Sequence, residues 1–138
     1  MLSDSWWRRH HIRKKTPDWD AFFDDCLGDP PLPLCGLPFI LEQSGYVVLN
    51  VTTRPERTRD KTIIWLSEHV GFYREVYMRP DDRSDSNRWK LETISLLAQQ
   101  NEVVFIFEDC PEVVAALRAM HLPVVPILSG YYNWAVKT

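Results

Sequence analysis

Features that would point to a secreted, membrane-bound or disulfide-rich protein are absent from this sequence. It has only 3 cysteines in 138 residues, an odd number with no Cys-x-x-Cys spacing, so neither a disulfide framework nor a structural metal site is expected. No apolar run approaches the roughly 18 residues that cross a bilayer. Residues 3–15 are polar, aromatic and basic, unlike the apolar region of a signal peptide. We therefore expect a reduced, cytoplasmic protein that does not enter a membrane.

A large excess of one charge is also missing. The chain carries 16 Lys and Arg against 19 Asp and Glu, which gives a formal net charge of -3 at pH 7. This balance argues against a protein that coats nucleic acid in bulk and against a polybasic membrane binder. Hydrophobic residues make up 45% of the chain and charged residues 25%. We expect one folded domain spanning residues 1–138.

Charge is nevertheless unevenly placed near the start of the chain. Residues 6–15 form a basic and aromatic block, and an acidic stretch that contains Asp18, Asp20 and Asp29 follows it. Two solvated faces of a surface helix and its lead-in would explain this pattern. The alternative is a surface that contacts phosphate or nucleic acid. The sequence leaves both interpretations open.

From residue 46 onward, apolar runs alternate with helical patterns. Strands are expected at residues 46–51, 75–78, 103–107 and 124–128. The first and third runs are almost continuously apolar. This pattern is typical of parallel strands whose two faces are both buried. Helical spacing connects these runs, with Pro111 suited to a first helical turn. The alternation predicts an α/β protein with a Rossmann-like parallel sheet and helices on both faces.

Chemically useful side chains follow the expected strands, where ligands bind in such sheets. Thr52 follows the first strand, Glu108 and Asp109 follow the third, and Lys90 begins the helix between them. A hydroxyl and an ammonium can hold phosphate oxygens, and two acids can hold Mg²⁺. Each also has an ordinary explanation, since Thr52 could cap a helix and a single lysine is usually solvated. Two acids at a strand end are harder to explain by packing.

The order of these motifs resembles the haloacid dehalogenase-like (HAD) phosphatase superfamily over nearly the whole chain. Residues 48–56 resemble its second motif, a hydrophobic strand that ends in Thr or Ser. Residues 89–94 resemble the motif with the lysine, and residues 105–109 the acidic fourth motif. The group related to the phosphatase domain of phage polynucleotide kinase is most similar in character, because a stretch like residues 78–83 precedes its lysine.

The resemblance implies roles for seven residues. Thr52 and Lys90 would be catalytic residues that hold the phosphate, and Glu108 and Asp109 would bind Mg²⁺. Substrate phosphate would be recognised by three arginines: Arg54, Arg79 and Arg83. Arginine suits this task because its guanidinium can donate two parallel hydrogen bonds to a phosphate.

The family's first motif is not found in its expected place. That motif is an apolar strand that ends in an aspartate nucleophile, with an acid/base aspartate two residues later, and residues 1–4 resemble the run just downstream of it. Asp18 and Asp20 have the right spacing, but no apolar strand precedes them. Without a carboxylate there, no aspartyl-phosphate intermediate can form. The chain as given is therefore expected to be inactive and to lack the main ligands of Mg²⁺.

In the family, the first-motif strand lies between the strands that correspond to residues 46–51 and 103–107. Its absence would leave two rows of backbone groups unpaired. Three outcomes are open: the two strands close up, a segment of another chain fills the gap, or the natural start lies upstream. A GTG valine codon read as a start at Met1 would produce the third outcome.

Two main hypotheses of function follow. The first is a HAD-type phosphatase whose longer form hydrolyses a phosphorylated small molecule or a nucleic-acid end, such as a polynucleotide 3′-phosphate or a nucleotide. The alternative is a non-catalytic, HAD-derived binding or assembly protein, with a phage origin, that forms a homodimer or takes a strand from a partner chain. A third, weaker hypothesis is nucleic-acid binding through residues 6–15.

Overall fold

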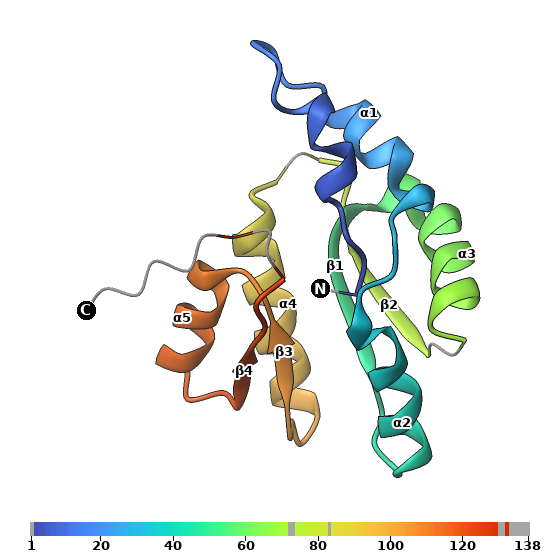
Figure 1. Ribbon diagram of the computed structural model, residues 1–138. Helices are drawn as coiled ribbons and strands as arrows, with labels where there is room; N and C mark the ends of the chain where they lie inside the picture. The colour runs from blue at the N-terminus through green and yellow to red at the C-terminus, as the bar shows by residue number, and fades with distance from the viewer. Residues whose placement is uncertain (1, 72–73, 83, 130–131, 133–138) are drawn as a thin grey trace.

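Four short strands form two separate parallel sheets in the computed structural model of the chain, which describes residues 2–71, 74–82, 84–129 and 132. Figure 1 shows the two sheets side by side, with the N-terminal helices above the β1-β2 sheet. The elements in chain order are η1 (Trp6–His11), α1 (Trp19–Asp24), η2 (Asp25–Gly28), η3 (Pro33–Gly36), α2 (Leu37–Gln43), β1 (Leu49–Pro55), η4 (Glu56–Thr58), α3 (Arg59–His69), β2 (Glu75–Arg79), α4 (Ser86–Gln100), β3 (Ile106–Glu108), α5 (Pro111–Ala119) and β4 (Val124–Pro126).

The first sheet joins β1 to β2 in parallel, with Leu49 opposite Glu75 and Thr52 opposite Met78. Helix α3 connects the two strands and packs on one face of the sheet (Figure 1). Its buried side chains Trp65 and Leu66 form a core with Cys35, Val70 and the partly buried Val76 of β2. Burial of these side chains, rather than the strand pairing alone, holds this half together.

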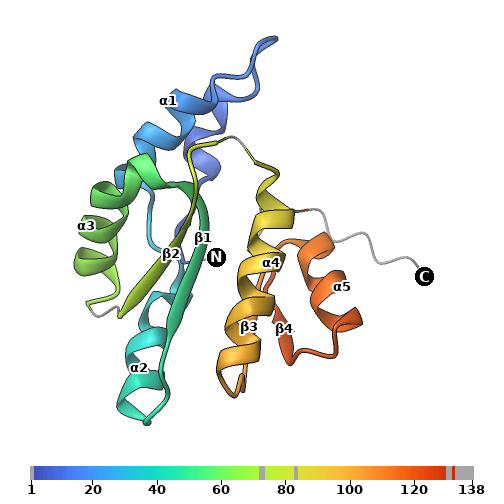
Figure 2. The ribbon, with the colours of Figure 1, turned by 180° about the vertical axis from the view of Figure 1, so that it is seen from behind.

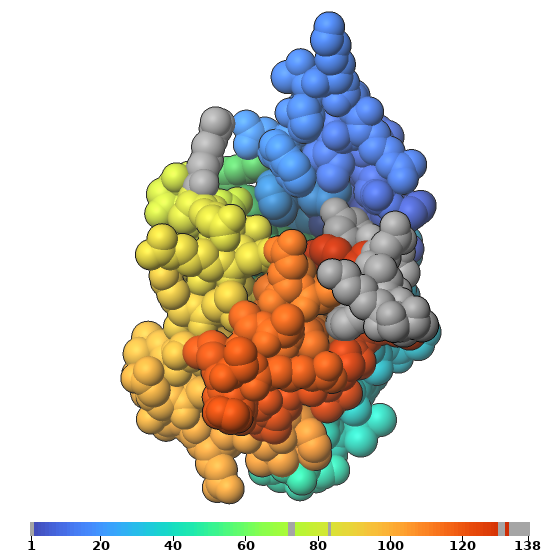
Figure 3. All heavy atoms as spheres, turned by 90° about the vertical axis from the view of Figure 1, so that its left-hand side faces the viewer, coloured from blue at the N-terminus to red at the C-terminus, as the bar shows by residue number. Residues whose placement is uncertain are grey.

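The second sheet joins β3 to β4 in parallel, with Ile106 opposite Val124. Helices α4 and α5 lie beside each other on the face of the molecule seen in Figure 3. Ile94 of α4 packs with Val113 and Leu117 of α5, both of which are fully buried. Val51 of β1 also packs against this cluster. Helix α4 therefore connects the two halves of the protein.

The single sheet expected from the sequence is not observed. The described strands form two sheets of two strands each, and β1 does not pair with β3. Figure 2 shows these two strands on either side of a gap. Two expected strands begin later than predicted: β1 begins at Leu49, opposite Glu75, and β3 begins at Ile106, opposite Val124. β1 also continues to Pro55, past its predicted end at residue 51. Residues 46–48 and 103–105 precede these ladders and are not in strands.

Helices connect the strands, as the helical spacing predicts. Pro111 occupies the first turn of α5, as predicted. Asp18 caps α1 by accepting a hydrogen bond from the backbone N–H of Ala21, which gives that aspartate a structural role. Among the described residues, no helix combines the length and the apolar character needed to cross a membrane.

Asp85 caps α4, the 15-residue helix that connects the two halves. Its carboxylate Oδ1 accepts a hydrogen bond from the Arg88 N–H at 2.7 Å. We expect Asp85→Ala to lower the free energy of unfolding by about 1 kcal/mol, because an N–H of the first turn loses its acceptor. Urea denaturation measures this change. Asp85→Asn should retain most of the stability, and equal losses in the two variants would contradict the capping role.

Candidate functional site

The candidate site lies where the carboxyl ends of β1 and β3 face a cavity of about 780 Å³. The structure brings five of the seven predicted site residues to this cavity: Thr52, Arg54, Lys90, Glu108 and Asp109. Arg79 does not line it, and Arg83 lies outside the described residues. The cavity therefore collects side chains from β1, α4 and the end of β3.

Lys90 and Glu108 form the polar centre of the site. The Lys90 Nζ donates to Glu108 Oε2 at 2.9 Å, and the two side chains are only 14% and 6% exposed. Lys90 lies in the second turn of α4, so this ion pair joins α4 to the end of β3. Partial burial strengthens such a pair compared with one in water. The pair fixes the position of a cationic group at the cavity wall.

The other carboxylate oxygen of Glu108 faces the start of α5. Oε1 accepts hydrogen bonds from the backbone N–H groups of Asp109, at 3.1 Å, and Cys110, at 2.9 Å. A negative charge at a helix N-terminus is stabilised by the helix dipole and by the free N–H groups there. Glu108 is thus held by backbone groups as well as by Lys90.

These contacts bear on whether the acidic pair can hold Mg²⁺. Mg²⁺ requires near-octahedral coordination by oxygen, and both oxygens of Glu108 already accept hydrogen bonds. Asp4 also lines the cavity, but its Oδ1 accepts from the Trp6 N–H at 2.8 Å. Within the described ranges, these carboxylates do not form a group of three with ligand atoms close enough to share an ion. The described side chains by themselves do not form a complete Mg²⁺ site.

Thr52 has a local contact within β1. Its Oγ1 accepts a weak hydrogen bond from the Arg54 N–H at 3.3 Å. Thr52 therefore does not cap a helix, which the sequence had left as the ordinary explanation. Its side chain is partly buried and lines the same cavity as Lys90.

Arg54 is held in a buried cluster around Asp29. The Arg54 guanidinium donates to Asp29 Oδ2 at 2.7 Å, to Ser3 Oγ at 3.0 Å and to Thr62 Oγ1 at 3.3 Å. Burial lowers the pKa of Arg54, and the neighbouring Cys26 and Asp29 oppose that effect. The guanidinium remains charged, as arginine does in proteins. Three of its five N–H donors are thus used within the fold.

Asp29 has a second arginine partner. The Arg8 guanidinium donates to both carboxylate oxygens, at 2.6 and 2.9 Å, and the Trp7 indole N–H donates at 3.0 Å. Asp29 is 1% exposed and Arg8 is 3% exposed. The sequence did not predict this cluster, because no periodicity relates residues that lie so far apart in the chain.

The position of Arg8 corrects the interpretation of residues 6–15. Both interpretations expect the basic side chains of this block to be exposed to solvent. Arg8 is instead one of the most buried polar residues of the described chain. Trp6, by contrast, is 47% exposed, and the Arg9 guanidinium lies 3.7 Å from the centre of its ring. The block therefore contributes both a structural ion pair and an exposed aromatic surface.

Arg79 lies at the end of β2 and binds backbone carbonyls. Its Nε donates to the Thr53 carbonyl and its Nη1 to the Ser84 carbonyl, both at 3.2 Å. It thus connects β1 to the segment that leads into α4. Its proposed contact with substrate stays a prediction.

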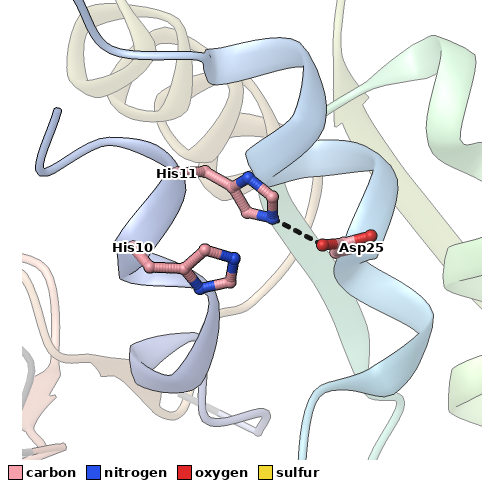
Figure 4. Close-up of side chains that lie close together, drawn as sticks. All are labelled: His10, His11 and Asp25. Atoms are coloured by element: carbon pink, nitrogen blue, oxygen red, sulfur yellow. Dashed lines mark hydrogen bonds and ion pairs between the residues drawn. The ribbon is translucent and has the colours of Figure 1, made fainter.

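A separate group of possible metal ligands lies on the N-terminal helices. His10, His11 and Asp25 place ligand atoms within 4.8 Å of one another. Figure 4 shows the two imidazole rings beside the Asp25 carboxylate. His11 Nε2 is hydrogen-bonded to Asp25 Oδ2 at 2.5 Å, and His10 Nδ1 lies 3.1 Å from the Trp7 carbonyl. His11 Nδ1, by contrast, is buried and has no hydrogen-bond partner among the described residues.

Comparisons with known proteins give one informative result. No family model and no curated protein matches this chain. A chain in a solved structure described as "Structure of the Pnkp1/Rnl/Hen1 RNA repair complex" is similar in fold, with a TM-score of 0.67 and 24% sequence identity. The match covers 76% of the present chain but 35% of the other. The chain thus spans about a third of that protein, and the fold is shared with one part of it.

Proposed function

We propose that this chain is a HAD-like, phosphatase-derived domain that binds a phosphomonoester at a nucleic-acid end, with Lys90 and Thr52 as its phosphate ligands. The observation that carries the proposal is the placement of Lys90. Its ammonium is held by Glu108 at the wall of the cavity, and the Thr52 side chain lines the same cavity. A fixed ammonium beside a hydroxyl can donate to phosphate oxygens.

Two further observations support this proposal. The cavity wall at the start of α5 is already arranged around negative charge, because the backbone N–H groups of Asp109 and Cys110 donate to Glu108 Oε1. The fold similarity to part of an RNA repair complex makes an RNA end a reasonable substrate class. Hydrolysis with Mg²⁺ would need additional carboxylates, which a polypeptide segment beyond the described residues would have to supply.

The proposal predicts a preference for RNA that ends in a 3′-phosphate. We expect a short 3′-phosphorylated oligoribonucleotide to bind at least about tenfold more tightly than the same RNA with a 3′-hydroxyl, because charge-assisted hydrogen bonds to the phosphate are gained. Fluorescence anisotropy in EDTA measures both affinities without any contribution from a metal. Equal affinities would contradict a terminal-phosphate site.

The alternative, a non-catalytic assembly protein, is favoured by a different observation. The carboxylates of the described chain do not complete a Mg²⁺ site, and β1 and β3 each have an edge without a strand partner. Both hypotheses expect no release of phosphate from p-nitrophenyl phosphate by this chain with Mg²⁺, so the preference for a 3′-phosphate is the measurement that distinguishes them. Turnover by the 138-residue chain would contradict the view that its carboxylates are insufficient for catalysis.

A further inference from the structure

The last two residues of η1 and the first residue of η2 bring three possible metal ligands together on the N-terminal helices. These residues are His10, His11 and Asp25, whose ligand atoms lie within 4.8 Å of one another. Figure 4 shows one ring nitrogen of His10 on the side that faces His11 Nε2 and the Asp25 carboxylate. Around a zinc ion, ligand atoms lie roughly 3.3–3.5 Å apart, because each bond to the metal is about 2.0–2.2 Å long. Small movements would therefore bring all three ligands onto one ion.

The tautomer of His10 suits a metal ligand. Its Nδ1 lies 3.1 Å from the Trp7 carbonyl oxygen. A carbonyl oxygen can only accept, so Nδ1 carries the proton of the neutral imidazole and the lone pair is on Nε2. A ring N–H that donates to a backbone carbonyl is the usual support of a metal-binding histidine. His10 Nε2 is thus prepared to bind an ion.

The His11 ring is held by a hydrogen bond to the third ligand of the group. Its Nε2 lies 2.5 Å from Asp25 Oδ2, whereas its Nδ1 is buried and has no partner among the described residues. An ion bound to both atoms would hold them about 0.8 Å further apart than they are here. The Asp25 side chain is 46% exposed, so it can move by this distance without disturbing the core.

Buried contacts fix the two segments that carry these ligands. Arg8 belongs to the same helix as the histidines and forms an ion pair with the buried Asp29, which directly follows η2. The backbone N–H of Asp18 donates to the His11 carbonyl at 3.0 Å, so the loop between η1 and α1 closes beside His11. Ligands on fixed backbone segments lose little conformational freedom when they bind. The fold itself therefore brings the site close to its bound geometry.

We propose that His10, His11 and Asp25 form a binding site for Zn²⁺ or a chemically similar divalent transition-metal ion, which joins η1 to η2. Imidazole and carboxylate groups bind zinc, whereas Mg²⁺ prefers oxygen ligands alone. Three protein ligands leave a fourth position for water. The scarcity of cysteine does not bear on a site of this composition. None of the three residues lines the cavity beside Lys90, so the proposal does not depend on the phosphate site.

Calorimetric titration of the full chain with Zn²⁺, after bound metal is removed with EDTA and the EDTA is dialysed away, tests the proposal. We expect one site with a Kd of about 10 μM or lower. The melting temperature should rise by about 5 °C or more when free Zn²⁺ exceeds the Kd about a hundredfold, because the ion binds the folded chain in preference. NMR of the imidazole nitrogens should show Zn²⁺-dependent shifts at His10 and His11.

Matched variants locate the ion at these residues. His10→Ala, His11→Ala and Asp25→Asn should each weaken Zn²⁺ binding at least about tenfold, because each removes a ligand. His121→Asn and Asp24→Ala are the controls and should bind Zn²⁺ normally. His121 has a φ of 58°, which asparagine tolerates, and the Asp24 side chain is 50% exposed. The melting temperature in EDTA shows that each variant folds, and His10→Ala should keep it because His10 is exposed.

Three results would overturn the proposal. One is a Kd for Zn²⁺ above about 10 μM. Another is an affinity that falls equally in the ligand variants and in the controls, which would indicate binding spread over the surface. The third is displacement of Zn²⁺ by Mg²⁺ at about 5 mM, because a site with two imidazole ligands should discriminate strongly against Mg²⁺.

Discussion

Asp29→Ala is expected to lower the free energy of unfolding by about 3–5 kcal/mol. Among the described side chains, Asp29 is the only carboxylate in a buried cluster that also contains two guanidinium groups, so its removal leaves two buried positive charges without a counter-charge. Arg8 and Arg54 both donate to Asp29, and its side chain is fully buried. Since small domains have a total stability of about 5–15 kcal/mol, this loss would threaten folding. The cluster also joins the N-terminal segment, η2 and β1, so its loss would affect the region beside the candidate site.

Two further variants keep this prediction testable if Asp29→Ala does not fold. Asp29→Asn retains the shape and one acceptor oxygen, so it should be destabilised by a smaller amount that urea denaturation can measure. Asp24→Ala removes a surface carboxylate that pairs with Arg57 and Lys61 and is 50% exposed. It should change stability by less than about 1 kcal/mol. Similar losses at Asp24 and Asp29 would contradict a special role for the buried cluster.

Lys90→Ala should abolish the preference for a terminal phosphate. A hydrogen bond from a charged donor contributes about 1.5–3 kcal/mol, so the affinity for the 3′-phosphorylated RNA should fall about tenfold to a hundredfold. The affinity for the 3′-hydroxyl RNA should hardly change, and the ratio of the two affinities should approach one. This ratio separates recognition of the phosphate from general weakening of the protein.

The control for Lys90→Ala is Lys61→Ala. Lys61 lies on α3, is 42% exposed and does not line the cavity. Both variants remove one positive charge, so a purely electrostatic effect would lower RNA affinity in both. A loss confined to Lys90 would support the site, and an equal loss in both variants would contradict it.

The sequence predicted well how strands and helices alternate along the chain, because this alternation depends on local patterns. Pro111 predicted the first turn of α5, and helical spacing predicted a connecting helix where α3 lies between β1 and β2. The third and fourth strands were predicted too long, because a strand extends only where a partner pairs with it. Residues 103–105 are as apolar as β3, yet they precede the first residue that pairs with β4.

The candidate site could be predicted only where neighbouring elements bring residues together. Lys90 and Glu108 were both expected at the site, and the structure adds that they form an ion pair. The Asp29 cluster could not be predicted, because Ser3, Arg8, Asp29 and Arg54 are widely separated along the chain. Arg54 in particular was expected to bind substrate, which stays a prediction, and the structure adds three partners within the fold that its sequence position does not indicate.

The measurement that most directly tests the phosphate site is an NMR titration with the 3′-phosphorylated RNA. Chemical-shift changes should concentrate at Thr52, the Lys90 ammonium and the backbone amides of Asp109 and Cys110, and they should be much weaker with 3′-hydroxyl RNA. Changes concentrated instead at residues 6–15, and equal for the two RNAs, would contradict the account and would favour nucleic-acid binding through the exposed N-terminal aromatic and basic side chains.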